Sequence, residues 1–136
     1  MNHVKRSMLV CMLAIVLTTL LTASGAQAAG LTGGKWRIVS SLNPGSSLNE
    51  LLGVVAVSAT TVWAVGDSAN SRHGPSQTLI EQGNGTNWQV VSSPNPGSSN
   101  NVLQGVAAVS ATDVWAVGDY YNTTKHKYQT LTELYS

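Results

Sequence analysis

After residue 35 the chain alternates between short apolar runs and stretches rich in Gly, Pro, Asn and Ser, which is typical of strands joined by turns. Runs such as Gly-Val-Val-Ala-Val and Val-Trp-Ala-Val are apolar at consecutive positions, so strands built from them need cover on both faces. No apolar pattern of helical period follows Ala28, and we expect almost no helix. The predicted strands are residues 36–41, 51–57, 62–66, 77–82, 88–93, 103–109, 114–118 and 129–135.

The same unit occurs twice in this region. Residues 36–84 align with residues 88–136 at a constant offset of 52 without a gap, and 29 of the 49 aligned positions are identical. A repeat of about 50 residues made of short strands is typical of β-propeller blades rather than of helical repeats. The sequence therefore predicts an all-β fold of two tandem four-stranded propeller-type blades, with repeat units 36–87 and 88–136 inside the region 29–136.

The motifs of the second unit resemble repeats of a known class of proteins. Its pattern is Trp-x-Val-Val-Ser-Ser-Pro-Asn-Pro-Gly-Ser-Ser, then Leu-x-Gly-Val-Ala-Ala-Val-Ser-Ala-Thr-Asp-Val-Trp-Ala-Val-Gly-Asp. It resembles the repeats of bacterial exported β-propellers, similar to those of photosystem II assembly factors and, more distantly, to sialidase-type Asp-box repeats. The Asp-box pattern Ser-x-Asp-x-Gly-x-Thr-Trp, laid onto Glu81–Trp88, keeps only Gly85 and Trp88. The resemblance therefore implies the fold over residues 36–136 and does not extend to sialidase chemistry.

Two blades are fewer than a closed propeller needs, since closure takes at least four. Open blade edges invite pairing with other chains. The unit order leaves the strand predicted at 36–41 without a preceding partner and the strand at 129–135 without a following one. A homo-oligomeric ring in which copies pair these strands would complete every blade, and three copies would give six blades. The alternative is a truncated remnant of a larger propeller without independent function.

The N-terminal segment predicts export. Lys5 and Arg6 precede an uncharged, mostly apolar run over residues 8–21, and Ala26-Gln27-Ala28 matches a small-x-small cleavage site. The run is too short for a membrane-spanning helix, which needs about 20 residues. We expect residues 1–28 to be a cleaved signal peptide and the mature chain to be secreted without a stable membrane anchor. The only cysteine, Cys11, lies in this segment, so no disulfide is expected.

Charge and chemistry-bearing residues are sparse, which excludes several classes of function. Only 10% of residues are charged. The sequence has no basic cluster after Lys5-Arg6, so a nucleic-acid partner is not expected. His73 and His126, without cysteines or clustered carboxylates, predict no metal site, and no cofactor is expected. Asp67 and Asp119 are interpreted as turn residues that follow a strand.

Catalysis is not expected either. Glu81 and Glu133 occupy matching positions in the two units and are interpreted as solvated side chains rather than as a catalytic pair. A sialidase- or glycosidase-like hydrolase, the second alternative, would need an arginine cluster and paired acids on one rim. We therefore expect an exported, non-enzymatic binding or structural module.

The predicted binding residues lie where the two units differ. Residues 68–76 and 120–128 share only the asparagine at equivalent positions, and both precede the last predicted strand of their unit. Alternate turns of an antiparallel meander fall on one edge, so these loops share a rim with the Asn-Pro-Gly-Ser-Ser loops. Aromatic and cationic side chains there suit a glycan, another surface ligand or an anion, although unconstrained drift of an exposed loop explains the difference equally well. The candidates are Tyr120, Tyr121, Lys125, His126, Lys127 and Tyr128.

Two strand-centre tryptophans are further candidates. Trp63 and Trp115 could stack on the apolar faces of sugars, while packing between blades is the alternative for both.

Overall fold

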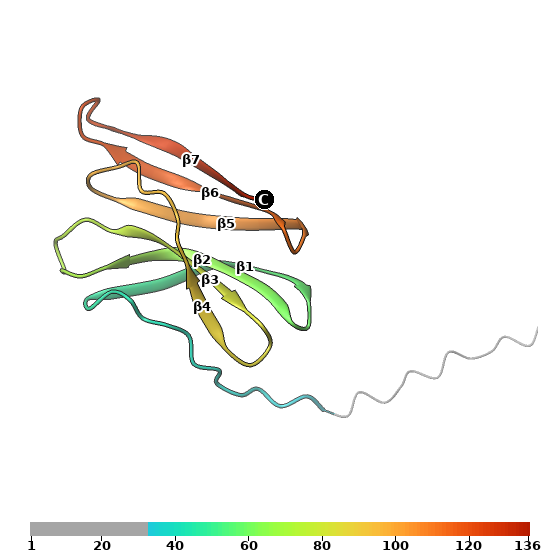
Figure 1. Cartoon of the computed structure of the whole chain (residues 1–136). Coiled ribbons are helices and arrows are strands. Elements are labelled where there is room, and N and C mark those ends of the chain that lie inside the picture. Colours follow the sequence, from blue (N-terminus) through green and yellow to red (C-terminus); the bar gives the residue numbers. More distant parts are fainter. Residues whose placement is uncertain (1–32) are drawn as a thin grey trace, which may run out of the picture. The chain divides into compact units, whose positions relative to one another are not determined.

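The computed structural model describes residues 33–136, which fold into two antiparallel β-sheets (Figure 1). Sheet I has the strand order β1 (Leu48–Ser58), β2 (Thr61–Ala69), β3 (Gln77–Gly83) and β4 (Trp88–Val91). Sheet II has the order β5 (Asn101–Ser110), β6 (Asp113–Asn122) and β7 (Lys127–Tyr135). The all-β prediction is confirmed, and residues 33–136 contain no helix. The signal peptide predicted at residues 1–28 lies outside the described residues.

The hairpins β1–β2 and β5–β6 pair in the same register after an offset of 52. Val55 pairs with Trp63 and Ala107 with Trp115, and each hairpin has two register shifts at equivalent positions. The Val-rich runs form these strands because branched side chains pack well on a pleated surface. Within residues 33–136, no helix is long and apolar enough to cross a membrane.

The core lies between the two sheets, which belong to one compact unit, Arg37–Ser136. Val65 and Ile80 of sheet I pack against three residues of sheet II, which are Leu103, Ala116 and Leu131. We call the two facing sides of the sheets the inner faces and their reverse sides the outer faces. Because successive side chains of a strand point to opposite faces, the consecutive apolar residues place apolar side chains on the outer faces as well, among them Val54 and Val117.

The strand predicted at residues 36–41 is wrong. Residues 33–45 contain no strand, although the equivalent segment of the second unit forms β4 and pairs with β3. The reason is the absence of a partner, because sheet I begins with β1 and no strand of the described region lies beside residues 37–41. The side chain of Ile38 is 98% exposed, as expected for an unpaired apolar strand residue.

The turn interpretation of Asp67 and Asp119 is also wrong. Strand β2 continues to Ala69 and β6 to Asn122, so both aspartates lie inside strands. Asp67 pairs with Thr78 on β3, and Asp119 pairs with Thr130 on β7. The extension of the strands past the apolar runs occurs because backbone pairing with β3 and β7 continues where the apolar residues end.

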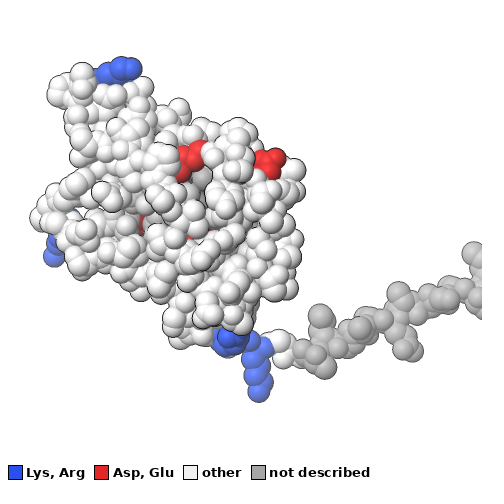
Figure 2. Space-filling view, in the orientation of Figure 1, with Lys and Arg blue, Asp and Glu red and all other residues white. Residues whose placement is uncertain are grey.

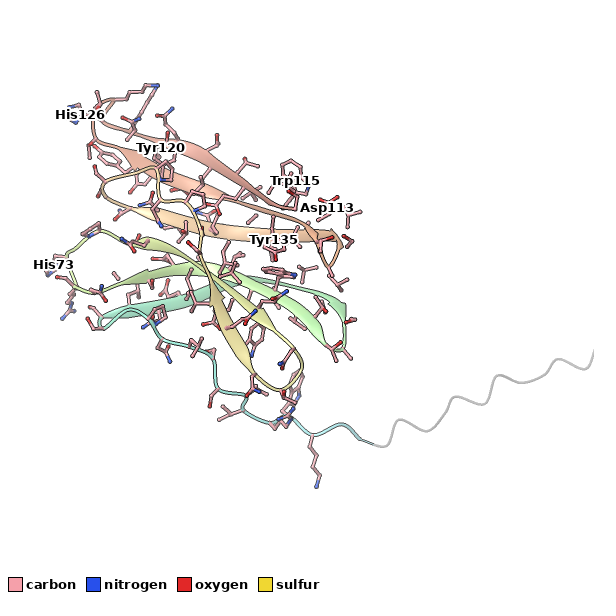
Figure 3. The ribbon with its side chains drawn as sticks, in the orientation of Figure 1. His73, Asp113, Trp115, Tyr120, His126 and Tyr135 are labelled. Carbon is pink, nitrogen blue, oxygen red and sulfur yellow. The ribbon has the colours of Figure 1, made fainter. Side chains whose placement is uncertain are left out.

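The loops do share one rim, as the meander predicts. The amide of Ser46 donates to Asn70 Oδ1 over 3.1 Å, and the Ser46 hydroxyl donates to the Asn70 carbonyl over 2.8 Å. In the second unit the hydroxyls of Ser98 and Thr123 lie 3.1 Å apart. We call the loops 44–47, 70–76, 96–100 and 123–126 the rim. Figure 3 shows His73 and His126 at this end of the molecule.

Candidate functional site

A hollow of about 570 Å³ opens at the rim and is lined by residues of both sheets. We call it the rim hollow. Its polar side chains come from β1, β2, the loop 70–76 and the loop before β5, while Leu52 and Val102 add apolar surface. The polar residues used below are Glu50, Asp67, Arg72, Ser76 and Asn100.

Two carboxylates meet in this hollow. Glu50 on β1 lies directly opposite Asp67 on β2, and the Asp67 side chain is 4% exposed. Burial raises the pKa of the Asp67 carboxyl above its ordinary value, the Glu50 carboxylate raises it further, and the Ser76 hydroxyl lowers it in part. The hollow is therefore lined by two neighbouring carboxyl groups, and Arg72 is another of its lining residues.

A buried asparagine links two loops of the rim through hydrogen bonds. Asn101 is 1% exposed, and its Oδ1 accepts from the Gly97 amide over 2.8 Å. Its Nδ2 lies 3.1 Å from the Ser76 carbonyl and 2.9 Å from the Gly97 carbonyl, so it ties the loop before β5 to the loop before β3. In the first unit Asn49 Oδ1 accepts from the Gly45 amide over 2.7 Å. The two asparagines hold the rim loops in fixed positions, which favours a preformed site.

The predicted loop residues are only partly together. The rings of Tyr121 and Tyr128 meet edge to face at 5.2 Å, and Tyr128 is exposed, with its hydroxyl 3.3 Å from Asn100 Nδ2. Lys125, His126 and Lys127 are exposed at the tip of the same hairpin. Tyr120 instead packs against the core, and its hydroxyl donates to Gln129. A second, open hollow of about 480 Å³ lies beside Tyr128 and includes Asp119.

The two candidate tryptophans have different environments. Trp63 lies on the inner face of sheet I with 1% exposure, and its ring is 4.7 Å from that of Tyr135. Other side chains cover the Trp63 ring, so in this structure Trp63 packs between the two sheets and has no free face for a sugar. Trp115 lies on the outer face of sheet II and is 44% exposed (Figure 3).

Glu81 is not solvated and Glu133 is half-buried, contrary to expectation. Glu81 is fully buried and accepts from the Leu42 amide over 3.0 Å through Oε1. Glu133 Oε2 accepts from the Ser93 hydroxyl over 2.8 Å. The remaining oxygen of each carboxyl is buried without a hydrogen-bond partner, and burial raises both pKa values above the ordinary value. Both glutamates therefore anchor the segment that leads into the first strand of their own sheet.

These glutamates predict that stability falls as the pH rises. A carboxyl whose pKa is raised by folding favours the folded state in its protonated form, so its contribution is full at acidic pH and is lost through the raised pKa. We expect the urea midpoint to fall between pH 4 and pH 8. Glu81→Gln and Glu133→Gln should each raise the midpoint at pH 8 and flatten this slope. An unchanged slope in both glutamine variants would contradict the assignment.

Comparisons with known proteins found no related protein at the thresholds used. A scan against protein-family models, a search of curated proteins and a search of solved structures each gave no match to this chain. Within residues 33–136, no group of three or more His, Cys, Asp or Glu side chains is placed to hold a metal ion. The face in Figure 2 is mostly uncharged, and its few Lys, Arg, Asp and Glu side chains are scattered.

Proposed function

We propose that this chain is an exported, non-enzymatic binding module of the β-propeller type, and that it binds a hydroxyl-rich ligand such as a cell-surface glycan at its rim. The observation that carries the proposal is the rim hollow, in which Glu50, Asp67, Arg72 and Asn100 converge from both sheets. The volume of about 570 Å³ falls within the usual range for small-ligand sites, roughly 300–1,000 Å³.

The chemistry of the hollow suits sugar hydroxyls. Carboxylates accept hydrogen bonds from hydroxyl groups, while the Arg72 guanidinium and the Asn100 amide donate to them. Leu52 and Val102 provide apolar surface for the C–H faces of a sugar ring.

The propeller-type architecture is supported by two features. Both units fold as antiparallel meanders with the same register, and the sheets stack through apolar faces, as neighbouring blades do. Strand β4, at the start of the second unit, completes sheet I of the first unit. The first strand of one unit therefore pairs with the last strand of the preceding unit, as the predicted ring of blades would need.

A glycan array probed with the purified chain tests the proposal. Arg72→Ala and Glu50→Gln should each weaken binding about 10-fold or more, because hydrogen bonds to charged groups contribute about 1.5–3 kcal/mol. The matched control is Thr124→Ala, at the position equivalent to Arg72 in the second unit, which should retain binding. Binding that is unchanged in both hollow variants would remove the rim hollow from the proposal, and no binding to any glycan would favour a remnant without independent function.

The loop residues need a separate variant. Tyr121→Ala combined with Tyr128→Ala removes the edge-to-face pair of half-buried Tyr121 and exposed Tyr128, and leaves the core residue Tyr120 in place. A loss about as large as that of Arg72→Ala would extend the binding surface to the tip of the β6–β7 hairpin. Full binding by this double variant would confine the ligand to the rim hollow.

One observation favours glycoside hydrolysis as a second candidate function. The pairing of Glu50 with Asp67 places two carboxyl groups side by side, and burial raises the pKa of the Asp67 carboxyl above its ordinary value. The same glycans that bind on the array should then release reducing ends on incubation, and Asp67→Asn should abolish this release. Binding without release leaves the non-enzymatic proposal in place.

A further inference from the structure

Identical residues of the two units differ sharply in exposure. On the inner face of sheet I, Trp63 and Val65 are each 1% exposed. Their equivalents on the outer face of sheet II, Trp115 and Val117, are 44% and 48% exposed. The sequence around them is the same, so the difference arises only because sheet II covers the first pair and nothing among the described residues covers the second.

The opposite sides of the sheets show the complementary difference. Leu103 on the inner face of sheet II is completely buried, while its equivalent Leu51 on the outer face of sheet I is 42% exposed. Val106 packs against the core, while its equivalent Val54 is 68% exposed. Sheet I therefore exposes two of the residue types that sheet II uses in the core contact, while Ala64 and Leu79, the equivalents of Ala116 and Leu131, are already buried.

We infer that a second copy of this chain packs head to tail on the outer face of sheet II, using the outer face of its own sheet I. This contact repeats the one between the two sheets within a chain: Trp115 and Val117 take the places of Trp63 and Val65, and the partner's Leu51 and Val54 take those of Leu103 and Val106. The two outer faces are complementary because residues of the same types already pack against each other between the two inner faces.

The unpaired segment at residues 37–41 fits the same arrangement. In sheet I, β4 lies at the edge of β3 and its chain then crosses to Glu133 of sheet II, where Ser93 donates to the carboxyl. In the first unit the equivalent crossing is already in place, with the Leu42 amide on Glu81. The residues before it, 37–39, are therefore positioned to add a fourth strand to β7 of the neighbouring copy. The register of β3 with β4 places Ile38 opposite Glu133.

The partner also completes a site. The rim hollow takes Asn100 and Val102 from the sheet that covers it. The second hollow, beside Asp119 and Tyr128, is formed by the equivalent positions of the second unit, and no sheet within residues 33–136 covers it. In the head-to-tail contact the partner's Leu48 and Glu50 fill that place, because they are the equivalents of Asn100 and Val102.

A head-to-tail contact leaves one free face at each end, so it repeats and forms a closed ring when the rotation between copies closes, or an open filament when it does not. Closed propellers usually have four to eight blades. Two, three or four copies would give four, six or eight sheets, and we infer a closed ring of that size.

Charged variants of the two exposed faces test this inference. Val117→Lys damages only the outer face of sheet II, and Val54→Lys damages only the outer face of sheet I; both side chains are exposed in the single chain. Each variant alone should be a monomer by light scattering. An equimolar mixture should form a 1:1 dimer, because one intact face of each kind remains. The control Ala111→Lys, in the exposed β5–β6 turn, should keep the mass of the unmodified chain.

The outcomes separate the possible occupants. A dimer in the mixture supports the inference and shows that both variants are folded. If Val54→Lys keeps the full mass while Val117→Lys loses it, the contact is a symmetric one between two copies of sheet II, which overturns the inference. A mixture that remains monomeric, or an unmodified chain that is monomeric, also overturns it. These results do not depend on ligand binding at the rim hollow.

Discussion

Replacing Trp63 with alanine is expected to lower the free energy of unfolding by roughly 3–5 kcal/mol, the usual cost of deleting a buried tryptophan. Trp63 is 1% exposed, lies between the two sheets and contacts the ring of Tyr135. A loss of this size is a large fraction of the stability of a small domain, about 5–15 kcal/mol in total. Urea unfolding followed by near-ultraviolet circular dichroism measures it.

Trp115→Ala is the matched control, because it removes the same side chain from the equivalent strand position. Trp115 is 44% exposed, so the loss should be about half as large or less when no second copy is present. The comparison is made in the Val54→Lys background, in which the head-to-tail contact cannot form. Equal losses for the two tryptophans would show that the two sheets are not packed as described.

Alanine at Gly66 or Gly118 is expected to destabilise the fold by more than about 3 kcal/mol or to prevent folding. A Cβ at Gly66 would overlap the Glu50 carbonyl oxygen, and one at Gly118 would overlap the Val102 carbonyl oxygen. Both obstacles are backbone atoms of the neighbouring strand, which no rotamer change can move aside. Expression yield and urea midpoints of the two variants provide the measurement.

Gly105→Ala serves as the control for this pair. A Cβ there meets only Val117 Cγ2 at 3.4 Å, an ordinary contact, so in the Val54→Lys background, which lacks the head-to-tail contact, the urea midpoint should change little or rise. A tolerated Gly66→Ala would contradict the close approach of β1 and β2 at this position.

The strands and the rim were predictable because they depend on local sequence. Consecutive apolar residues mark β1, β2, β5 and β6, and the order of turns places alternate loops on one edge. The pairing of Glu50 with Asp67 was not predictable. Extending the ladder from Ser58 and Thr61 at the turn would place Leu52 opposite Asp67, but two register shifts in β1 bring Glu50 there instead. Such shifts leave no clear signal in a single sequence.

The different burial of equivalent residues in the two units could not be predicted from the sequence either. Trp63 and Trp115 stand in identical surroundings along the chain, and only the neighbouring sheet decides which is covered. The matching positions of Glu81 and Glu133 in the two units predict solvated side chains, but their hydrogen-bond partners, Leu42 and Ser93, lie about 40 residues away in sequence. Non-local contacts of this kind decide burial, whereas the apolar pattern decides only which segments form strands.

The central claim is that the faces left exposed in one chain are the two halves of the contact already made inside it. The most direct measurement is the solution mass of the full chain, expressed with its own N-terminal segment so that any processing is retained, by light scattering after size exclusion. The account predicts one discrete species of two, three or four copies across a wide range of concentrations. A monomer at all concentrations, or a continuous series of aggregates without a closed species, would contradict it.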